Sequence, residues 1–184
     1  MRIAIAGCGA LGSHIAVMIA KQEHDFDLFD HDRIQAHNVL TGTTVYTQDH
    51  IGNFKARVLA GILYGKYRIR ARSHIKPVDS SIMLDDYDLV IDCFDNIEAR
   101  RFTTTCVAKT KVHVGVAPQM IGAVEWSDNG YQLPKQDMHN EVCTHDVGRN
   151  IILLTSVVAS VIISNYLETG VQQDAVVSGL EIYK

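Results

Sequence analysis

The sequence has no pair of cysteines spaced as C-x-x-C. Its four cysteines are scattered along the chain, at Cys8, Cys93, Cys106 and Cys143. A disulfide framework or a four-cysteine zinc site needs cysteines in closely spaced, paired patterns. The sequence therefore predicts a protein of the reducing cytoplasm that holds no structural zinc.

The sequence also has no surplus of basic residues. Lys and Arg number 17 and Asp and Glu number 21, which gives a net charge of −4 and a pI of about 6.1. Binding to the phosphate backbone of nucleic acids relies on an excess of positive charge. This composition argues against nucleic acid as a partner.

Export signals, internal repeats and linkers are missing too. The apolar stretch after Met1-Arg2 is soon interrupted by Gly7, so it is too short for the core of a secretory signal. A chain of 184 residues has the size of one α/β core. We therefore expect a single nucleotide-binding domain over residues 1–184, located in the cytoplasm.

The one long uncharged run extends from Asn150 to Leu167. Its 18 residues are at the lower limit of what spans a bilayer, and serines and threonines interrupt it. We expect a helix over residues 151–167 in the core or at an interface, and no membrane span.

Short apolar runs alternate with longer segments of helical periodicity. This alternation predicts an α/β fold with a Rossmann-like, doubly wound and mostly parallel sheet. The expected strands are 3–6, 26–29, 68–75, 89–91 and 112–117. The expected helices are 13–21, one that starts near residue 51 after a polar loop, 98–109 and 151–167.

The pattern changes after residue 117. Residues 123–126 and 131–133 flank Asp128-Asn129-Gly130, a tight-turn signal that predicts an antiparallel hairpin in the C-terminal region. A loop over residues 134–148 and a last short strand near 175–182 complete the expected fold.

A glycine-rich motif, G-x-G-x-x-G, stands between the first strand and the first helix, at Gly7, Gly9 and Gly12. Glycines in this context let the backbone approach the phosphates of a ligand at a helix N-terminus. Asp30 ends the second strand, where a carboxylate can bind a ribose hydroxyl. NAD and ATP both satisfy this pattern, and a glycine turn that serves only close packing remains an alternative.

Lys55 favours ATP over NAD. It lies among apolar residues, next to Phe54 and one turn after Ile51, where an ammonium group would be partly buried and would need an anion. The alternative is a lysine whose aliphatic chain merely covers the core.

Two carboxylates, Asp92 and Asp95, follow the buried strand 89–91. The carboxyl ends of strands are where open α/β sheets bind their ligands. Mg²⁺ in proteins typically takes one or two carboxylates together with substrate phosphates, so Asp95 is the predicted ligand and Asp92 its helper. Alternatively, Asp95 or Asn96 caps the helix that follows, a role compatible with ligand binding.

Taken in order, these motifs resemble the ATP-dependent adenylating enzymes related to ubiquitin activation, the ThiF, MoeB and HesA family. The resemblance covers residues 1 to about 167. It rests on G-x-G-x-L-G-S at residues 7–13, D-x-D at Asp30 and Asp32, Asn38, I-G-x-x-K at 51–55, D-N-x-x-x-R at 95–100, Gly122-Ala123-Val124 and Cys143-Thr144.

The resemblance implies roles for these residues. Asp30 would bind the ribose, Lys55 the ATP phosphates and Asp95 the Mg²⁺, in agreement with the roles argued from the residues themselves. Asp32, Asn38 and Asn96 would also belong to the nucleotide site. The implied acceptor is the C-terminus of a small ubiquitin-like or sulfur-carrier protein or of a peptide, and the implied assembly is a homodimer.

The sequence departs from the family pattern in two ways. After its asparagine the family has an arginine that helps to hold the triphosphate, but Thr41 stands at that position here. Losing a charge-assisted hydrogen bond costs about 1.5–3 kcal/mol, so we expect weak ATP binding unless Arg33 or another basic group substitutes. The paired C-x-x-C motifs of many relatives are also absent.

Cys143 occupies the position at which family members with a thiol step keep their cysteine. The neighbouring His139 and His145 can favour its thiolate, whereas Asp146 would disfavour it. A metal site on the same residues, or an inert cysteine, are the alternatives.

The sequence therefore predicts an adenylyltransferase that activates a carboxylate with ATP and Mg²⁺. An NAD-binding oxidoreductase is the first rival, but it leaves Lys55 and the Asp92–Asn96 cluster without a role. A non-catalytic, nucleotide-dependent interaction module is the second rival, since the family arginine is missing.

Overall fold

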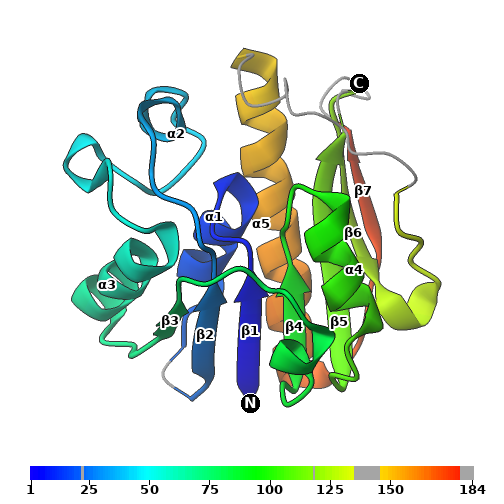
Figure 1. The fold of residues 1–184 in the computed structure, drawn as a ribbon. Helices are drawn as coiled ribbons and strands as arrows, with labels where there is room; N and C mark the ends of the chain where they lie inside the picture. The colour runs from blue at the N-terminus through cyan, green and yellow to red at the C-terminus, as the bar shows by residue number, and fades with distance from the viewer. Residues whose placement is uncertain (22, 118, 135–145, 179–184) are drawn as a thin grey trace.

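A seven-stranded sheet forms the centre of the molecule, with strand order β3-β2-β1-β4-β5-β6-β7 (Figure 1). The computed structural model describes residues 1–21, 23–117, 119–134 and 146–178. The strands are β1 (Arg2–Ala6), β2 (Asp25–Phe29), β3 (Arg72–His74), β4 (Leu89–Asp92), β5 (Thr110–Ala117), β6 (Ile121–Trp126) and β7 (Ala175–Ser178).

The sheet is doubly wound, as predicted. Strands β3, β2, β1, β4 and β5 are parallel, whereas β6 and β7 are antiparallel additions at one edge. The strand order reverses between β1 and β4, and open α/β sheets bind ligands in the crevice at this switch point. The mostly parallel sheet with an antiparallel C-terminal region is thereby confirmed.

Helices cover both faces of the sheet (Figure 1). Ile3 and Ile5 of β1 belong to the main core, with α1 (Ala10–Ile19), α3 (Lys55–Tyr67) and α5 (Asp146–Thr169), while Ala4 belongs to a smaller core on the opposite face. That face carries α4 (Ile97–Thr105) and the 3-10 helix η2 (Ser81–Leu84). Successive residues of a strand point to opposite faces, so the buried central strands are apolar throughout.

The long helix α5 is part of the main core. It packs closely on α1, and Gly122 of β6 approaches it so closely that a Cβ there would lie 1.9 Å from Thr155 Oγ1. Among the described residues, its part from Gly148 to Thr169 is the one helix long and apolar enough to cross a membrane by length and composition, with 44% of its apolar window buried. A core helix passes the same test, and the buried residues of α5 include Ile151, Ile152, Ala159 and Ile163.

The predicted hairpin around Asp128-Asn129-Gly130 is wrong. The hairpin pairs β5 with β6, and the next partner of β6 is β7. Residues 127–129 instead form the 3-10 helix η3 (Ser127–Asn129), and residues 131–134 form no strand. The reason is that Asp174 accepts a hydrogen bond from the backbone N–H of Trp126, which aligns β7 along β6, while the ring of Tyr131 stacks on His113.

Several predicted boundaries shift. Helix α1 runs from Ala10 to Ile19 rather than over 13–21, and α4 ends at Thr105 rather than near 109. Helix α3 begins at Lys55, because η1 (Gln48–His50) and a turn precede it, and β3 spans Arg72–His74 rather than 68–75. The structure places α5 from residue 146, inside the predicted loop 134–148.

A short helix, α2 (Ala36–Leu40), lies in the predicted polar loop. The predicted last strand ends at Ser178 within the described residues.

Candidate functional site

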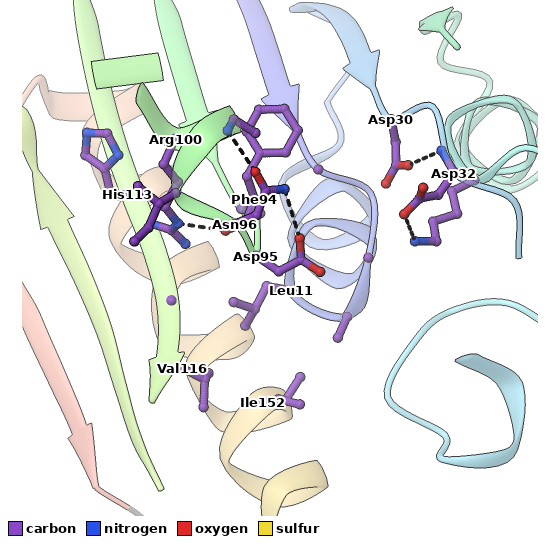
Figure 2. A pocket seen from close by; sticks show the side chains of 18 of the residues that line it. Leu11, Asp30, Asp32, Phe94, Asp95, Asn96, Arg100, His113, Val116 and Ile152 are labelled. Carbon is purple, nitrogen blue, oxygen red and sulfur yellow. Dashed lines mark hydrogen bonds and ion pairs between the residues drawn. The ribbon is translucent and has the colours of Figure 1, made fainter. Parts of the chain in front are cut away.

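A cavity of about 1180 Å³ opens above the carboxyl ends of β1, β2 and β4. Its lining extends from the glycine turn and Asp30 on one side to β5, β6 and Ile152 of α5 on the other. Figure 2 shows Asp30 and Asp32 on one flank, Asp95 and Asn96 near the start of α1, and Val116 and Ile152 across from them. The candidate site therefore lies where the switch point of the sheet predicts it.

Gly7 and Gly12 are required by space and backbone conformation. Gly7 has φ +95°, and a Cβ on it would lie 2.8 Å from the carbonyl oxygen of Cys93. A Cβ on Gly12 would lie 1.8 Å from the carbonyl oxygen of Gly7. No side chain other than hydrogen fits at these positions, so the turn between β1 and α1 is held against the end of β4.

Gly9 is different, because a Cβ there would meet no atom within 4 Å. It is the N-cap residue of α1, and no side chain caps this helix end. The first N–H groups of a helix lack partners in the helix and attract anions. Gly9 therefore opens the backbone of α1 toward the cavity.

Asp30 is a buried carboxylate at the end of β2, with 9% of its surface exposed. One oxygen accepts a hydrogen bond from the backbone N–H of Cys8 and the other from that of Asp32, both at 2.8 Å. Burial raises the pKa of Asp30, although Lys55 and the two N–H groups act in the opposite direction. Asp30 is thus fixed beside the glycine turn, at the cavity wall.

Lys55 forms an ion pair with Asp32, with 2.9 Å between Nζ and Oδ2. Only 13% of the lysine side chain is exposed, whereas 57% of the Asp32 side chain is. Burial opposes the charge of Lys55, but Asp30, Asp32 and Asp95 outweigh it and raise the pKa of the ammonium. The partial burial that the sequence predicts is therefore real, and the ammonium is held among carboxylates at the cavity.

Asp92 has protein partners on both oxygens. Its Oδ1 accepts the backbone N–H of Phe94 at 3.0 Å, and its Oδ2 accepts the hydroxyl of Thr103 at 2.7 Å and lies 2.8 Å from His113 Nδ1. Burial alone would raise the pKa of this fully buried carboxyl, but Arg100, His113 and Thr103 lower it. The geometry thus gives Asp92 a structural position beneath the loop, rather than a direct contact with the cavity.

Asp95 and Asn96 divide the two roles predicted for this loop. Asn96 is the N-cap of α4, since its Oδ1 accepts the backbone N–H of Ala99 at 2.8 Å. Asp95 is exposed, accepts a 3.4 Å hydrogen bond from Asn96 Nδ2, and lines the cavity.

Asn38 and Thr41 also line the cavity. The side chain of Asn38 accepts the backbone N–H of Gln35 at 2.9 Å and so caps α2. The hydroxyl of Thr41 donates to the carbonyl of His37. The predicted nucleotide residue Asn38 therefore also stabilises the short helix that carries the position of the missing arginine.

Two residues that line the cavity, His113 and Tyr131, were not predicted from the sequence, and neither was Tyr46, which supports the glycine turn. His113 joins Asp92 to Ser127 Oγ, 2.8 Å from Nε2, and its ring stacks on Tyr131 with 3.6 Å between centroids. Tyr46 donates its hydroxyl to the carbonyl of Cys8 at 2.6 Å. The signal that could have indicated a buried polar network is the lone histidine inside the apolar strand 112–117.

The cysteines divide into two groups. Cys8, Cys93 and Cys106 are free thiols, and burial raises the pKa of each. Cys143, with His139 and His145, lies outside the described residues.

The family model of the ThiF family matches residues 1–177. This chain belongs to the ThiF family. No curated protein sequence matches it.

Solved structures share its fold. Escherichia coli MccB with ATP matches with a TM-score of 0.77 and 15% identity over 99% of this chain and 61% of that one. MccB in complex with N-formylated MccA matches with a TM-score of 0.73 and 14% identity, over 99% of this chain and 62% of that one. The E. coli tRNA N6-threonylcarbamoyladenosine dehydratase TcdA matches with a TM-score of 0.55 and 22% identity, over 66% of this chain and 56% of that one. The chain thus spans about three fifths of the length of these proteins.

The site fits a nucleotide phosphate chain with a divalent cation. Gly9 leaves the N-terminus of α1 open, and Lys55 supplies a positive charge beside it. Among residues 1–21, 23–117, 119–134 and 146–178, no group of three or more His, Cys, Asp or Glu side chains could hold a metal ion. A single exposed carboxylate such as Asp95 suits Mg²⁺, which takes its remaining ligands from phosphates and water.

We predict that Asp92→Asn destabilises the fold by about 3 kcal/mol at pH 7, because it removes the charge that compensates the buried Arg100. The folded-state pKa of Asp92 is lowered, so its stabilisation is complete at neutral pH and is lost as the pH falls through that value. The difference between wild type and variant should therefore shrink below about pH 4.

Urea unfolding of both proteins between pH 7 and pH 3 measures this difference. The exposed Asp86→Asn is the control and should change stability little. A difference between wild type and Asp92→Asn that is independent of pH would contradict the assignment.

Proposed function

We propose that this protein is an ATP-dependent adenylyltransferase that activates a carboxylate. The observation that carries the proposal is the open backbone at Gly9, with Asp30 and the Lys55–Asp32 pair on one flank of the cavity and Asp95 near the start of α1. Membership of the ThiF family and the likeness of the fold to MccB with ATP support it.

Each residue then has a defined task. Asp30, fixed by two backbone N–H groups, accepts hydrogen bonds from the ribose hydroxyls. The N–H groups at the start of α1 bind phosphate oxygens, and Gly9 allows their close approach. Asp32 keeps the ammonium of Lys55 at the cavity until the phosphates replace it as partner.

In the proposed reaction an oxygen of the acceptor carboxylate attacks the α-phosphorus of ATP. A P–O bond to the α-phosphate forms, the bond to the bridging oxygen breaks, and pyrophosphate leaves. Lys55 stabilises the negative charge of the phosphate oxygens, and the preorganised backbone N–H groups add to this. Mg²⁺ at Asp95, when bound, offsets further negative charge.

An NAD-binding oxidoreductase is the weaker alternative. It would use the glycine turn and Asp30 but would leave the Lys55–Asp32 pair and the exposed Asp95 without a task. A non-catalytic nucleotide-dependent module would bind Mg·ATP but would not release pyrophosphate, whichever acceptor is added.

The acceptor is proposed to be the C-terminus of a ubiquitin-like or sulfur-carrier protein or of a peptide. The cavity continues past the phosphate region to Val116, Ala123, Glu125 and Tyr131, which leaves room for an extended chain end. MccB, which shares this fold, forms a complex with N-formylated MccA, and this supports a second binding partner for the proposed enzyme.

We predict that Lys55→Ala and Asp95→Ala each weaken Mg·ATP binding at least tenfold, because each removes a charge that acts on the phosphates. Isothermal titration calorimetry measures the affinity. Lys66→Ala, on the same helix, and Asp86→Ala are matched exposed controls that should bind as the wild type does. Equal affinity in all five proteins would refute the assigned roles.

Cys143 remains a predicted nucleophile. As a nucleophile, Cys143 would attack the acyl adenylate to form a thioester and release AMP, so Cys143→Ala is expected to release pyrophosphate but to accumulate no thioester. Because burial raises the pKa of the three described thiols, alkylation by iodoacetamide below pH 8 should occur mainly at Cys143. Slow labelling of Cys143, with the pH dependence of an ordinary cysteine, would remove it from the mechanism.

We further propose a cytoplasmic homodimer formed through α5. Leu154, Val157 and Val161 are 44%, 48% and 64% exposed and follow one side of this helix. Val157→Asp should convert the dimer to a monomer, whereas Ile82→Asp, at an exposed position on η2, should leave it intact. Light scattering measures both, and a monomeric wild type at micromolar concentrations would contradict the proposal.

A further inference from the structure

Among the described residues, each arginine or lysine side chain that lines the cavity already has a partner within the protein. Three such side chains line it, Lys55, Arg33 and Arg100. Lys55 pairs with Asp32. Arg33 donates to the carbonyl of Gly52 at 2.6 Å and lies 4.0 Å above the ring of Phe54.

Arg100 is held by two hydrogen bonds to backbone carbonyls. Its Nε donates to the carbonyl of Phe94 at 2.7 Å and its Nη2 to that of Val114 at 2.8 Å. Only 11% of its side chain is exposed. The carboxylates Asp30, Asp32, Asp95, Glu98 and Glu125 meanwhile line the same cavity. A further positive charge would therefore strengthen the binding of a nucleoside triphosphate in this cavity.

Arg149 of α5 lies beside the segment 41–43, which contributes to the cavity wall. A Cβ on Gly42 would lie 3.1 Å from the guanidinium carbon of Arg149 and 3.3 Å from Nη2, so the guanidinium rests against Gly42. The residues on either side, Thr41 and Thr43, line the cavity. The guanidinium of Arg149 thus lies beside a segment that lines the cavity, although Arg149 belongs to another element.

The backbone of Gly42 and the start of α5 support this placement. Gly42 has φ +62°, a conformation that other residues rarely adopt. Ile152, one helical turn after Arg149, lines the cavity and packs with Ala10 and Leu11 at the start of α1. The first turns of α5 therefore lie beside the phosphate region of the site.

Arg149 is also exposed, as an anion-binding residue must be. Within the described parts of the chain no carboxylate forms an ion pair with it. Thr41 stands where the family pattern has its arginine, and the adjacent Gly42 leaves the space that the guanidinium of Arg149 occupies. The position that lacks the family arginine, Thr41, and the residue that makes room for Arg149, Gly42, are therefore adjacent in the sequence.

We propose that Arg149 binds the terminal phosphates of the nucleoside triphosphate in place of the arginine that is missing at Thr41. Its guanidinium packs against Gly42, which leaves the space for it. This inference rests on the proposed function. A guanidinium is suited to the task, since it stays charged and donates paired hydrogen bonds to phosphate oxygens.

The test compares Mg·ATP with AMP in calorimetric titrations of wild type and Arg149→Ala. The variant should bind Mg·ATP about ten- to a hundredfold more weakly. Its affinity for AMP, which lacks the terminal phosphates, should not change. Arg101→Ala, an exposed arginine on α4, is the control and should bind both nucleotides as the wild type does.

A second pair of variants tests the replacement itself. Thr41→Arg should restore Mg·ATP binding in the Arg149→Ala background and should have a smaller effect in the wild type, since the two arginines would serve the same phosphates. Circular dichroism of each variant confirms that it is folded.

Three outcomes are distinguishable. Unchanged Mg·ATP binding by Arg149→Ala, with binding by the wild type intact, overturns the inference and leaves the proposed function standing. An equal loss for AMP and Mg·ATP shows a structural role for Arg149 and also overturns it. A wild type that binds no Mg·ATP refutes the proposed function itself.

Discussion

The contact between the glycine turn and the end of β4 is the constraint on which the site depends. The backbone N–H of Gly7 donates to the carbonyl of Phe29 on β2, and that of Cys93 donates to Ala6 on β1. The turn is thereby tied to both neighbouring strands. Since Gly12 approaches the carbonyl of Gly7 so closely, this contact fixes the direction in which α1 leaves the turn.

This constraint also sets the charges around the cavity. Asp30 accepts the N–H of Cys8 in the same turn, so its carboxylate cannot move away from the start of α1. Lys55 lies among Asp30, Asp32 and Asp95, and these three raise the pKa of its ammonium. A phosphate chain that enters the cavity therefore meets an ammonium that is already charged and oriented, and little reorganisation is needed.

Much of the fold follows from local patterns in the sequence. The buried runs of β1, β2, β4 and β5 are short and apolar, which predicts strands of a parallel sheet. Helix α2 has no buried residue and depends on the capping interaction between Gln35 and Asn38, so hydrophobic periodicity does not reveal it. The hairpin prediction failed because Asp174, 48 residues after Trp126, fixes the strand that pairs with β6.

The site could be predicted only in part for the same reason. Gly7, Gly12, Asp30 and Lys55 lie in motifs whose chemistry is local. Asp92 has the position of a metal ligand in the sequence. In the structure its carboxylate instead pairs with His113 and Arg100, which belong to other elements. Arg149 is separated from Gly42 by more than a hundred residues, so only the fold reveals their contact.

The central claim is that the cavity binds a nucleoside triphosphate for adenylyl transfer. A crystal structure of the protein with Mg²⁺ and AMPCPP, an ATP analogue with a stable bond between the α- and β-phosphates, tests it most directly. We expect the ribose at Asp30, the phosphates between Gly9 and Lys55, and Mg²⁺ at Asp95. Phosphates bound away from the start of α1, or a cavity that takes NAD and leaves AMPCPP unbound, would contradict it.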